Sequence, residues 1–204
     1  MSLPRLYDFE LSGNCHKIRL LLALLGVEYE RIDIDIRSGG SQSPEFLAIN
    51  PRGQVPVYAD GDAVIWDSMA ILAYLARRYG DAHWLPTEPL ALARVMQWLA
   101  VSENEILYGL ARARAVLKMG RPFDLDAAQA MGRSALDVLE QRLATEHWLA
   151  GGDMPSIADI ACFPYVALAP QGGLPLDTYP AVRAWIGRVQ ALPGYVGMPG
   201  IEAY

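Results

Sequence analysis

The stretch LYDFELSGNCHKIRLLLALLGVEYERIDI, residues 6–34, decides the fold of the first half of this chain. It opens with the strand-like pair Leu6 and Tyr7. Between residues 15 and 25, apolar side chains recur at helical spacing, and Gly26 ends that helix as a C-terminal cap would. Residues 29–34 then alternate as a strand does. Two strands joined by one helical crossover pair in parallel, with a right-handed connection, so the stretch predicts a βαβ unit.

The residues that follow extend this unit. A short helix is expected over residues 44–49, and a hairpin is expected from residues 55–58 and 63–65 around Asp60-Gly61-Asp62. Asp67 then caps a helix that runs to Gly80. The order βαβαββα over residues 1–80 predicts an α/β, thioredoxin-like N-terminal domain.

The second half of the chain reads as helical throughout. Pro86 and Pro89 mark a linker over residues 81–89, and no convincing strand pattern follows it. Residues 90–204 are expected to form an all-helical C-terminal domain. Its helices are expected over residues 90–117, 125–144 and 160–169 and from Tyr179-Pro180 to Pro193-Gly194, with a capping-box-like start at Ser156-Ile157-Ala158-Asp159.

Composition narrows the classes of function. The 204 residues carry a formal net charge of -6, so the basic stripe of a nucleic-acid-binding protein is not expected. No signal-peptide pattern or membrane-length apolar run is seen, which favours a cytoplasmic protein without a membrane partner. The two cysteines, Cys15 and Cys162, make no disulfide framework, and His16, His83 and His147 lack metal-site spacing, so no metal is expected.

Five motifs, in this order and spacing, carry a resemblance that covers almost the whole chain. They are Ser12-Gly13-Asn14-Cys15, residues 50–56 (NPRGQVP), residues 67–72 (DSMAIL), Ser156-Ile157-Ala158-Asp159, and Tyr179-Pro180 with Leu192-Pro193-Gly194. Together they resemble the glutathione S-transferases, broadly the serine-type, theta-like bacterial members. The resemblance implies glutathione as co-substrate, a small electrophile as second substrate, and a homodimer.

Thiol activation is the chemistry such a site must supply. Lowering a thiol pKa by about two units requires about 2.7 kcal/mol of preferential thiolate stabilisation. A hydroxyl donor contributes about 1.5–3 kcal/mol, and a helix N-terminus adds about 0.3–1 kcal/mol. Ser12 offers both, although a turn or cap role is the alternative from position alone. Cys15 is the rival, because cysteine-type transferases form mixed disulfides near this position. Tyr7 ranks last, and Asn14 is expected to orient the sulfur.

The resemblance also places the glutathione backbone. Val55-Pro56 resembles the family's cis-proline turn, which would leave the Val55 amide and carbonyl free to pair with the cysteinyl backbone of glutathione. Gln54 replaces a lysine that many relatives carry and is expected to bind the glycyl carboxylate with less charge. Arg52 or Lys17 would compensate. Ser41 and Gln42 lie in the loop where relatives contact the glycyl end.

The γ-glutamyl end is expected at the helix that begins after Asp67. The Asp67 carboxylate suits the ammonium group, and the Ser68 hydroxyl and amide suit the carboxylate at a positive helix end. An ordinary N-cap role is compatible with this assignment. On the long helix, Glu103 and Asn104 are expected either to reach the partner subunit's glutathione or to form a solvated face.

The second-substrate wall is expected on the same helix, where Trp98, Tyr108, Arg112 and Arg114 lie, although core or solvated-face roles suit each of them individually. We expect conjugation of the glutathione thiolate, activated by Ser12, to a small, mostly apolar electrophile. Thiol transfer or reduction through Cys15 is one alternative. A non-catalytic, glutathione-transferase-like binding or regulatory module is the other.

Overall fold

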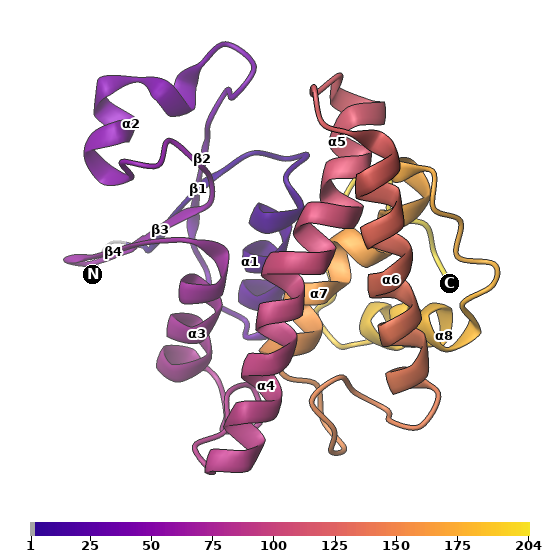
Figure 1. The fold of residues 1–204 in the computed structure, drawn as a ribbon. Coiled ribbons are helices and arrows are strands. Elements are labelled where there is room, and N and C mark those ends of the chain that lie inside the picture. Colours follow the sequence, from indigo (N-terminus) through magenta and orange to yellow (C-terminus); the bar gives the residue numbers. More distant parts are fainter. Residues whose placement is uncertain (1–2) are drawn as a thin grey trace.

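The computed structural model describes residues 3–204 (Figure 1). Its four-stranded sheet has the order β2-β1-β3-β4, built from Arg5–Asp8 (β1), Glu30–Asp33 (β2), Val57–Asp60 (β3) and Ala63–Trp66 (β4). β1 pairs in parallel with β2, whereas β3 is antiparallel to both β1 and β4. The predicted parallel unit and hairpin are therefore confirmed. They pair with each other through β1 and β3, which form the centre of the sheet.

Three helices complete this half. The helices α1 (Gly13–Leu24) and α3 (Ser68–Tyr79) lie between the sheet and the helical half, while α2 (Pro44–Ile49) lies on the side away from it (Figure 1). Gly26 follows α1 in the left-handed region at φ 65°, as predicted for a C-terminal glycine. A 3-10 turn, η1 (Gly40–Gln42), leads into α2.

The helical half is built around one long rod of three consecutive segments. These are α4 (Pro89–Val101), η2 (Ser102–Ala111) and α5 (Arg112–Met119). The sequence predicts a single helix here, but the structure makes η2 π-helical. In η2, Gly109 lies directly against α6, where a Cβ atom on it would be 2.5 Å from the Gly132 nitrogen. π-helical turns often occur at functional sites, and this one faces the cleft described below.

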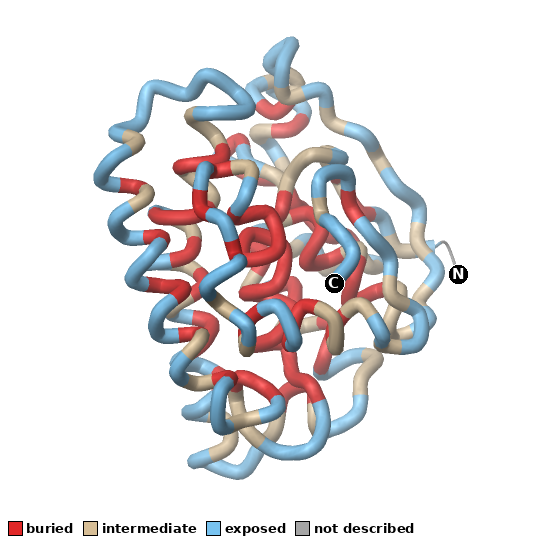
Figure 2. The backbone as a smooth tube through the Cα atoms, turned by 90° about the vertical axis from the view of Figure 1, so that its right-hand side faces the viewer, coloured by how far each residue is buried: buried red, intermediate tan, exposed pale blue. Residues whose placement is uncertain are grey.

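The remaining helices pack behind this rod. They are α6 (Leu125–Leu143), α7 (Ile157–Ala167), the 3-10 turn η3 (Ala169–Gly172) and α8 (Pro180–Gln190). Every residue of α7 is buried, and Figure 2 shows the buried backbone concentrated in the middle of the molecule. Across residues 3–204, no helix is long and apolar enough to cross a membrane.

The start of α7 confirms the predicted capping box. The Ser156 hydroxyl accepts from the Ala158 amide at 3.2 Å, and Asp159 Oδ2 accepts from the Ser156 amide at 2.9 Å. Asp159 Oδ1 also accepts from Leu149 N and from Trp185 Nε1, both at 3.0 Å. Burial raises the pKa of this carboxyl, and its hydrogen bonds partly offset that rise. The motif is thus a buried fold element that joins α7 to α8.

Candidate active site

A cavity of about 600 Å³ opens between the two halves, within the size range of small-molecule sites. Two walls face each other across it. The first is supplied by the thioredoxin-like half: Ser12, Asn14, Ile36, Ser41, Gln42, Asn50, Arg52, Gly53, Gln54, Val55, Pro56, Asp67 and Ser68. The second is supplied by the helical half: Glu103, Leu107, Tyr108, Ala111, Arg112, Ala115, Arg121, Phe123 and Tyr165. Most predicted site residues lie in these walls. The exceptions are Tyr7, Cys15, Lys17, Trp98, Asn104 and Arg114, which do not line the cavity.

Ser12 is the N-cap of α1. Its Oγ accepts a hydrogen bond from the Cys15 amide at 3.2 Å, and its own amide donates to the Phe9 carbonyl at 2.9 Å. A hydroxyl carries one proton beside its acceptor lone pairs, so the O–H remains able to donate into the cleft. The positive end of a twelve-residue helix lies at the same place. The cap role and a donor role are therefore compatible in one side chain.

Cys15, the rival catalytic candidate, does not line the cleft. Its side chain is fully buried on the inner side of α1. Burial, followed by the nearby Asp8 carboxylate, raises the pKa of the Cys15 thiol to about 12, although the hydrogen bond with Ser12 acts in the opposite direction. A thiol at this position stays protonated and out of contact with any molecule in the cleft.

Asn14 and Tyr165 flank Ser12 in the cleft. Asn14 Oδ1 is buried and finds no hydrogen-bond partner among residues 3–204. Tyr165 of α7 lies against the first turn of α1, where a Cβ atom on Gly13 would be only 2.6 Å from its ring. Burial raises the pKa of Tyr165 to about 12, so its hydroxyl is a neutral hydrogen-bonding group at physiological pH. Gly13 thus permits close packing of the Tyr165 ring on α1, and Tyr165 and Ser12 both line the cleft.

The Val55–Pro56 peptide bond is cis, as the motif predicts. The ladder between β1 and β3 begins at Val57, so the Val55 amide and carbonyl lie outside it at the cleft wall. Gln54 is exposed in this wall. Beside it, Gln42 Nε2 donates to the Gly53 carbonyl at 3.0 Å. This edge presents backbone and amide groups to the cleft.

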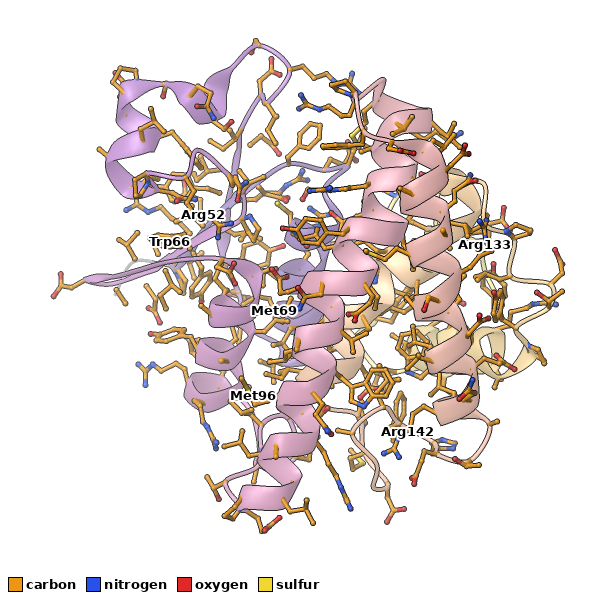
Figure 3. All side chains as sticks on the ribbon, in the orientation of Figure 1. Arg52, Trp66, Met69, Met96, Arg133 and Arg142 are labelled. Atoms are coloured by element: carbon orange, nitrogen blue, oxygen red, sulfur yellow. The ribbon has the colours of Figure 1, made fainter. Side chains whose placement is uncertain are left out.

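The N-terminus of α3 forms the next part of the wall. Asp67 Oδ1 accepts from Met69 N at 2.9 Å, and Oδ2 lies 3.2 Å from Arg52 Nη1. Asp67 has φ 79°, in the left-handed region, where a residue with a side chain is strained and such strain often marks a functional position. Ser68 is buried beside it. Arg52 also lies over the Trp66 ring at 5.7 Å (Figure 3).

A buried lysine lies beneath this end of the cleft. Lys17 of α1 is fully buried, donates to Ser102 Oγ at 3.2 Å and lies 3.9 Å from Glu103 Oε1. Burial lowers the pKa of Lys17 to about 8, while Glu103 acts in the opposite direction. Burial also raises the pKa of Glu103, which Lys17 partly offsets and Asp67 adds to. Lys17, expected to compensate for Gln54, does not line the cleft, and it lies beside Glu103 instead.

Of the candidates for the second-substrate wall, two line the cavity and two are buried. Tyr108 and Arg112 line the cavity, with the Arg112 guanidinium 4.1 Å from the Tyr108 ring centre. Trp98 is buried in the core instead. Arg114 is also buried, and its Nη1 donates to the Leu11 carbonyl at 3.0 Å, which ties the loop before Ser12 to α5. Separately, Asn104 donates to the Ala100 carbonyl at 2.8 Å on its own helix.

Among the lining residues that the sequence did not predict, three carry charged or aromatic side chains: Arg121, Phe123 and Tyr165. Tyr165 follows the capping box by six positions in a continuous apolar run, so its periodicity marks only a buried helix. Arg121 and Phe123 lie in the connection after α5, where sequence shows only a turn. A basic residue beside an aromatic one in that loop is the available signal, and it is a weak one.

The fold and the cleft define a class of two-domain protein. A thioredoxin-like domain is followed by a helical domain, and the site lies between a polar wall and a largely apolar wall. Family models agree with both halves. Residues 4–77 match the glutathione S-transferase N-terminal domain, and residues 122–188 match the C-terminal domain. The chain therefore belongs to the glutathione S-transferase family and is a glutathione transferase.

Solved structures and curated relatives cover nearly the whole chain. A glutathione S-transferase from Pseudomonas fluorescens is 38% identical with a TM-score of 0.89, covering 97% of this chain and 100% of that one. A homologue from Drosophila mojavensis with bound glutathione is 28% identical with a TM-score of 0.85, covering 95% and 90%.

The curated relatives carry three different activities in their names. A probable glutathione S-transferase of Oryza sativa is 32% identical, covering 94% of this chain and 93% of its own. The disulfide-bond oxidoreductase YfcG of Escherichia coli is 32% identical, covering 91% and 89%. A maleylacetoacetate isomerase of Pseudomonas aeruginosa is 31% identical, covering 94% and 93%. Membership of the family is thus compatible with transferase, oxidoreductase and isomerase reactions.

Proposed function

We propose that this enzyme conjugates the glutathione thiolate to small, mostly apolar electrophiles, with Ser12 as the hydrogen-bond donor to the sulfur, as in the serine-type members. The observation that carries this proposal is the position of the Ser12 hydroxyl. It lies in the cleft at the N-terminus of α1, with its oxygen engaged by the Cys15 amide and its proton without an acceptor among residues 3–204. Cys15, the alternative group, is buried.

The energy available at this position is sufficient. About 2.7 kcal/mol lowers a thiol pKa by about two units. One hydrogen bond to a charged sulfur contributes about 1.5–3 kcal/mol, and the end of a helix adds about 0.3–1 kcal/mol. One hydroxyl at the end of α1 therefore meets the requirement without a catalytic triad. Asn14, with its unpartnered amide oxygen, is proposed to orient the thiol.

The remaining polar groups suit the rest of glutathione, which is proposed as the co-substrate. The backbone of Val55, before Pro56, would pair with the cysteinyl residue as an added strand does. Ser68 and the N-terminus of α3 would bind the γ-glutamyl carboxylate. The ammonium group would lie between Asp67 and Glu103.

Glutathione's glycyl end remains, and Gln42 and Gln54 are the groups assigned to it. Both are exposed in the cleft wall and carry amide donors. Arg52 contributes less there, because its guanidinium is engaged by Asp67 and stacks on Trp66. We therefore assign the glycyl carboxylate to neutral donors.

A glutathione titration that follows thiolate absorbance tests the proposal. Ser12→Ala should raise the pKa of bound glutathione by about 1–2 units and lower kcat/KM for an aryl halide about 10–100-fold, because a charge-assisted hydrogen bond is lost. Ser12→Thr should restore much of the activity. Glu88→Ala removes a comparable N-cap, that of α4, at a residue that does not line the cleft, and controls for the loss of a cap. A fully active Ser12→Ala enzyme would refute the assignment.

Glutathione-dependent disulfide reduction is a second candidate, favoured by the relative named as a disulfide-bond oxidoreductase. In it, one glutathione thiolate attacks a disulfide, forms a mixed disulfide and releases a thiolate. A second glutathione thiolate then attacks the glutathione sulfur of the mixed disulfide, which forms oxidised glutathione and releases the other substrate sulfur as a thiolate. Because Cys15 is buried, the thiolate at Ser12 would serve this reaction too. Cys15→Ala should leave the rate of disulfide reduction unchanged. Loss of disulfide reduction in that variant would instead support a cysteine mechanism.

We also propose a homodimer. Large apolar side chains are exposed on neighbouring elements of one side, at Val64 and Trp66 on β4 and at Leu90 and Met96 on α4. Figure 3 shows Trp66, Met69 and Met96 running from the sheet across α3 to α4. Light scattering should give twice the mass of the chain, and Met96→Asp should shift the enzyme toward the monomer.

A further inference from the structure

The charges in the cleft are unevenly paired. Both carboxylates of its walls, Asp67 and Glu103, have a cationic partner. Arg112 and Arg121 line the opposite wall, and no carboxylate in the part of the chain that the structure describes lies within ion-pair distance of either. The electrophile half of the cleft therefore carries two free positive charges, in a chain whose net charge is -6.

Arg112 is held in a defined orientation. Its guanidinium carbon lies 4.1 Å from the centre of the Tyr108 ring and 4.9 Å from the centre of the Phe123 ring. Ring contacts engage the faces of a guanidinium, whereas its N–H donors lie in the plane and stay available. That planar fork matches a carboxylate with two parallel hydrogen bonds. Arg112 is thus oriented by its neighbours for an anion that the protein itself does not supply.

We propose that the second substrate is an electrophile that bears a carboxylate, which Arg112 and Arg121 bind. This inference rests on the proposed conjugation, and it narrows the substrate class. The same wall contains Leu107 and Ala111, which suit an aromatic or unsaturated carbon skeleton. The carboxylate would lie toward α5 and the loop after it, with the reacting carbon toward Ser12 on the opposite wall.

A matched pair of aryl chlorides tests this inference. One is a chlorodinitrobenzoate with chlorine para to the carboxylate, and the other is its methyl ester. With either, the glutathione sulfur forms a bond to the ring carbon that bears chlorine. The carbon–chlorine bond then breaks, chloride leaves with the electron pair, and the thiol proton goes to solvent. Each kcat/KM is divided by the uncatalysed rate constant, so that the different reactivities of the two rings cancel.

Arg112→Gln and Arg121→Gln should each lower the carboxylate-to-ester ratio about tenfold, mainly through KM, as expected for a binding group remote from the reacting carbon. Arg112→Lys should fall between glutamine and wild type, because it keeps the charge and loses the fork. Added salt should lower the wild-type ratio as well. Arg133→Gln, on α6 and away from the cleft (Figure 3), should leave the ratio unchanged.

Three results would overturn the inference, and they differ from one another. An unchanged ratio in both arginine variants, with wild-type turnover of the ester, refutes the carboxylate site and leaves the conjugation standing. In the second result, the carboxylate-to-ester ratio is unchanged but the KM for glutathione, measured with the ester, rises in these variants. The arginines then bind a carboxylate of glutathione instead. No turnover of either compound by the wild-type enzyme refutes the proposed conjugation, and the substrate class with it.

Discussion

Lys17 should destabilise the folded protein at neutral pH. The side chain is fully buried, and burial lowers its pKa from 10.5 to about 8. Each pKa unit corresponds to about 1.36 kcal/mol, so holding the charged lysine costs about 3 kcal/mol of folding free energy at pH 7. We therefore predict that Lys17→Met, of similar length and without the charge, is more stable than wild type by about 3 kcal/mol.

The pH dependence of that difference provides the sharper test. The unfolded chain keeps the lysine proton up to about pH 10.5, whereas the folded chain releases it from about pH 8. Between these values the unfolded state binds more protons, so the wild type gains stability as pH rises. The advantage of Lys17→Met should therefore shrink from about 3 kcal/mol at pH 7 to about 1 kcal/mol at pH 10. Titrating groups that Lys17 does not contact are common to both proteins and cancel, and Glu103, which it does contact, is treated below.

Urea denaturation at the two pH values measures this difference. Lys118→Met, at an exposed lysine in α5, controls for the loss of a positive charge at the surface. Lys17→Met also removes the partner of Glu103, whose side chain is 33% exposed although its Oε1 is buried, so the comparison is repeated in a Glu103→Gln background. A Lys17→Met protein less stable than wild type at pH 7, or a stability difference that does not change with pH, would refute the reasoning.

Two further predictions concern the first turn of α1. Gly13→Ala should destabilise the protein by about 1–3 kcal/mol in chemical denaturation, because the new methyl group would lie 2.6 Å from the Tyr165 ring; wild-type stability would contradict this packing. A thiol reagent at pH 8 should leave Cys15 unmodified in the folded protein and modify it after denaturation, because burial raises its pKa to about 12. Mass spectrometry checks the second prediction, and rapid labelling of Cys15 in the native enzyme would contradict it.

Local signals predict the elements of this fold well. Gly26 ends α1 because the backbone there needs a positive φ, and Asp60-Gly61-Asp62 turns the hairpin for the same reason. Ser12 and Asp67 are N-caps of α1 and α3, a role that residue type and position predict directly. Because the cleft lies at the ends of these two helices, a prediction of caps also locates the part of the first wall formed by Ser12, Asn14, Asp67 and Ser68.

Contacts between distant parts of the chain were beyond prediction. Lys17 fits the apolar side of α1 only because Ser102 and Glu103, more than eighty residues later, surround its ammonium group. Tyr165 reaches the first turn of α1 only because Gly13 has no side chain to exclude it. The π-helical geometry of η2 likewise has no signature in the spacing of its residues. These features depend on packing between the two halves, which local periodicity does not report.

Two N-cap residues of the cleft, Ser12 and Asp67, keep part of their hydrogen-bonding capacity for another partner. At Ser12, the hydroxyl oxygen accepts a hydrogen bond from the first turn of the helix. The hydroxyl proton stays available to donate a hydrogen bond, which a thiolate would accept. At Asp67, the helix engages Oδ1, while Oδ2 lies beside Arg52 at the cleft. In both residues the cap uses part of the side chain's hydrogen-bonding capacity and fixes the position of the rest. Helix capping therefore orients these two side chains toward the cleft before any substrate binds, so the cap role and the proposed functional role are compatible at each residue.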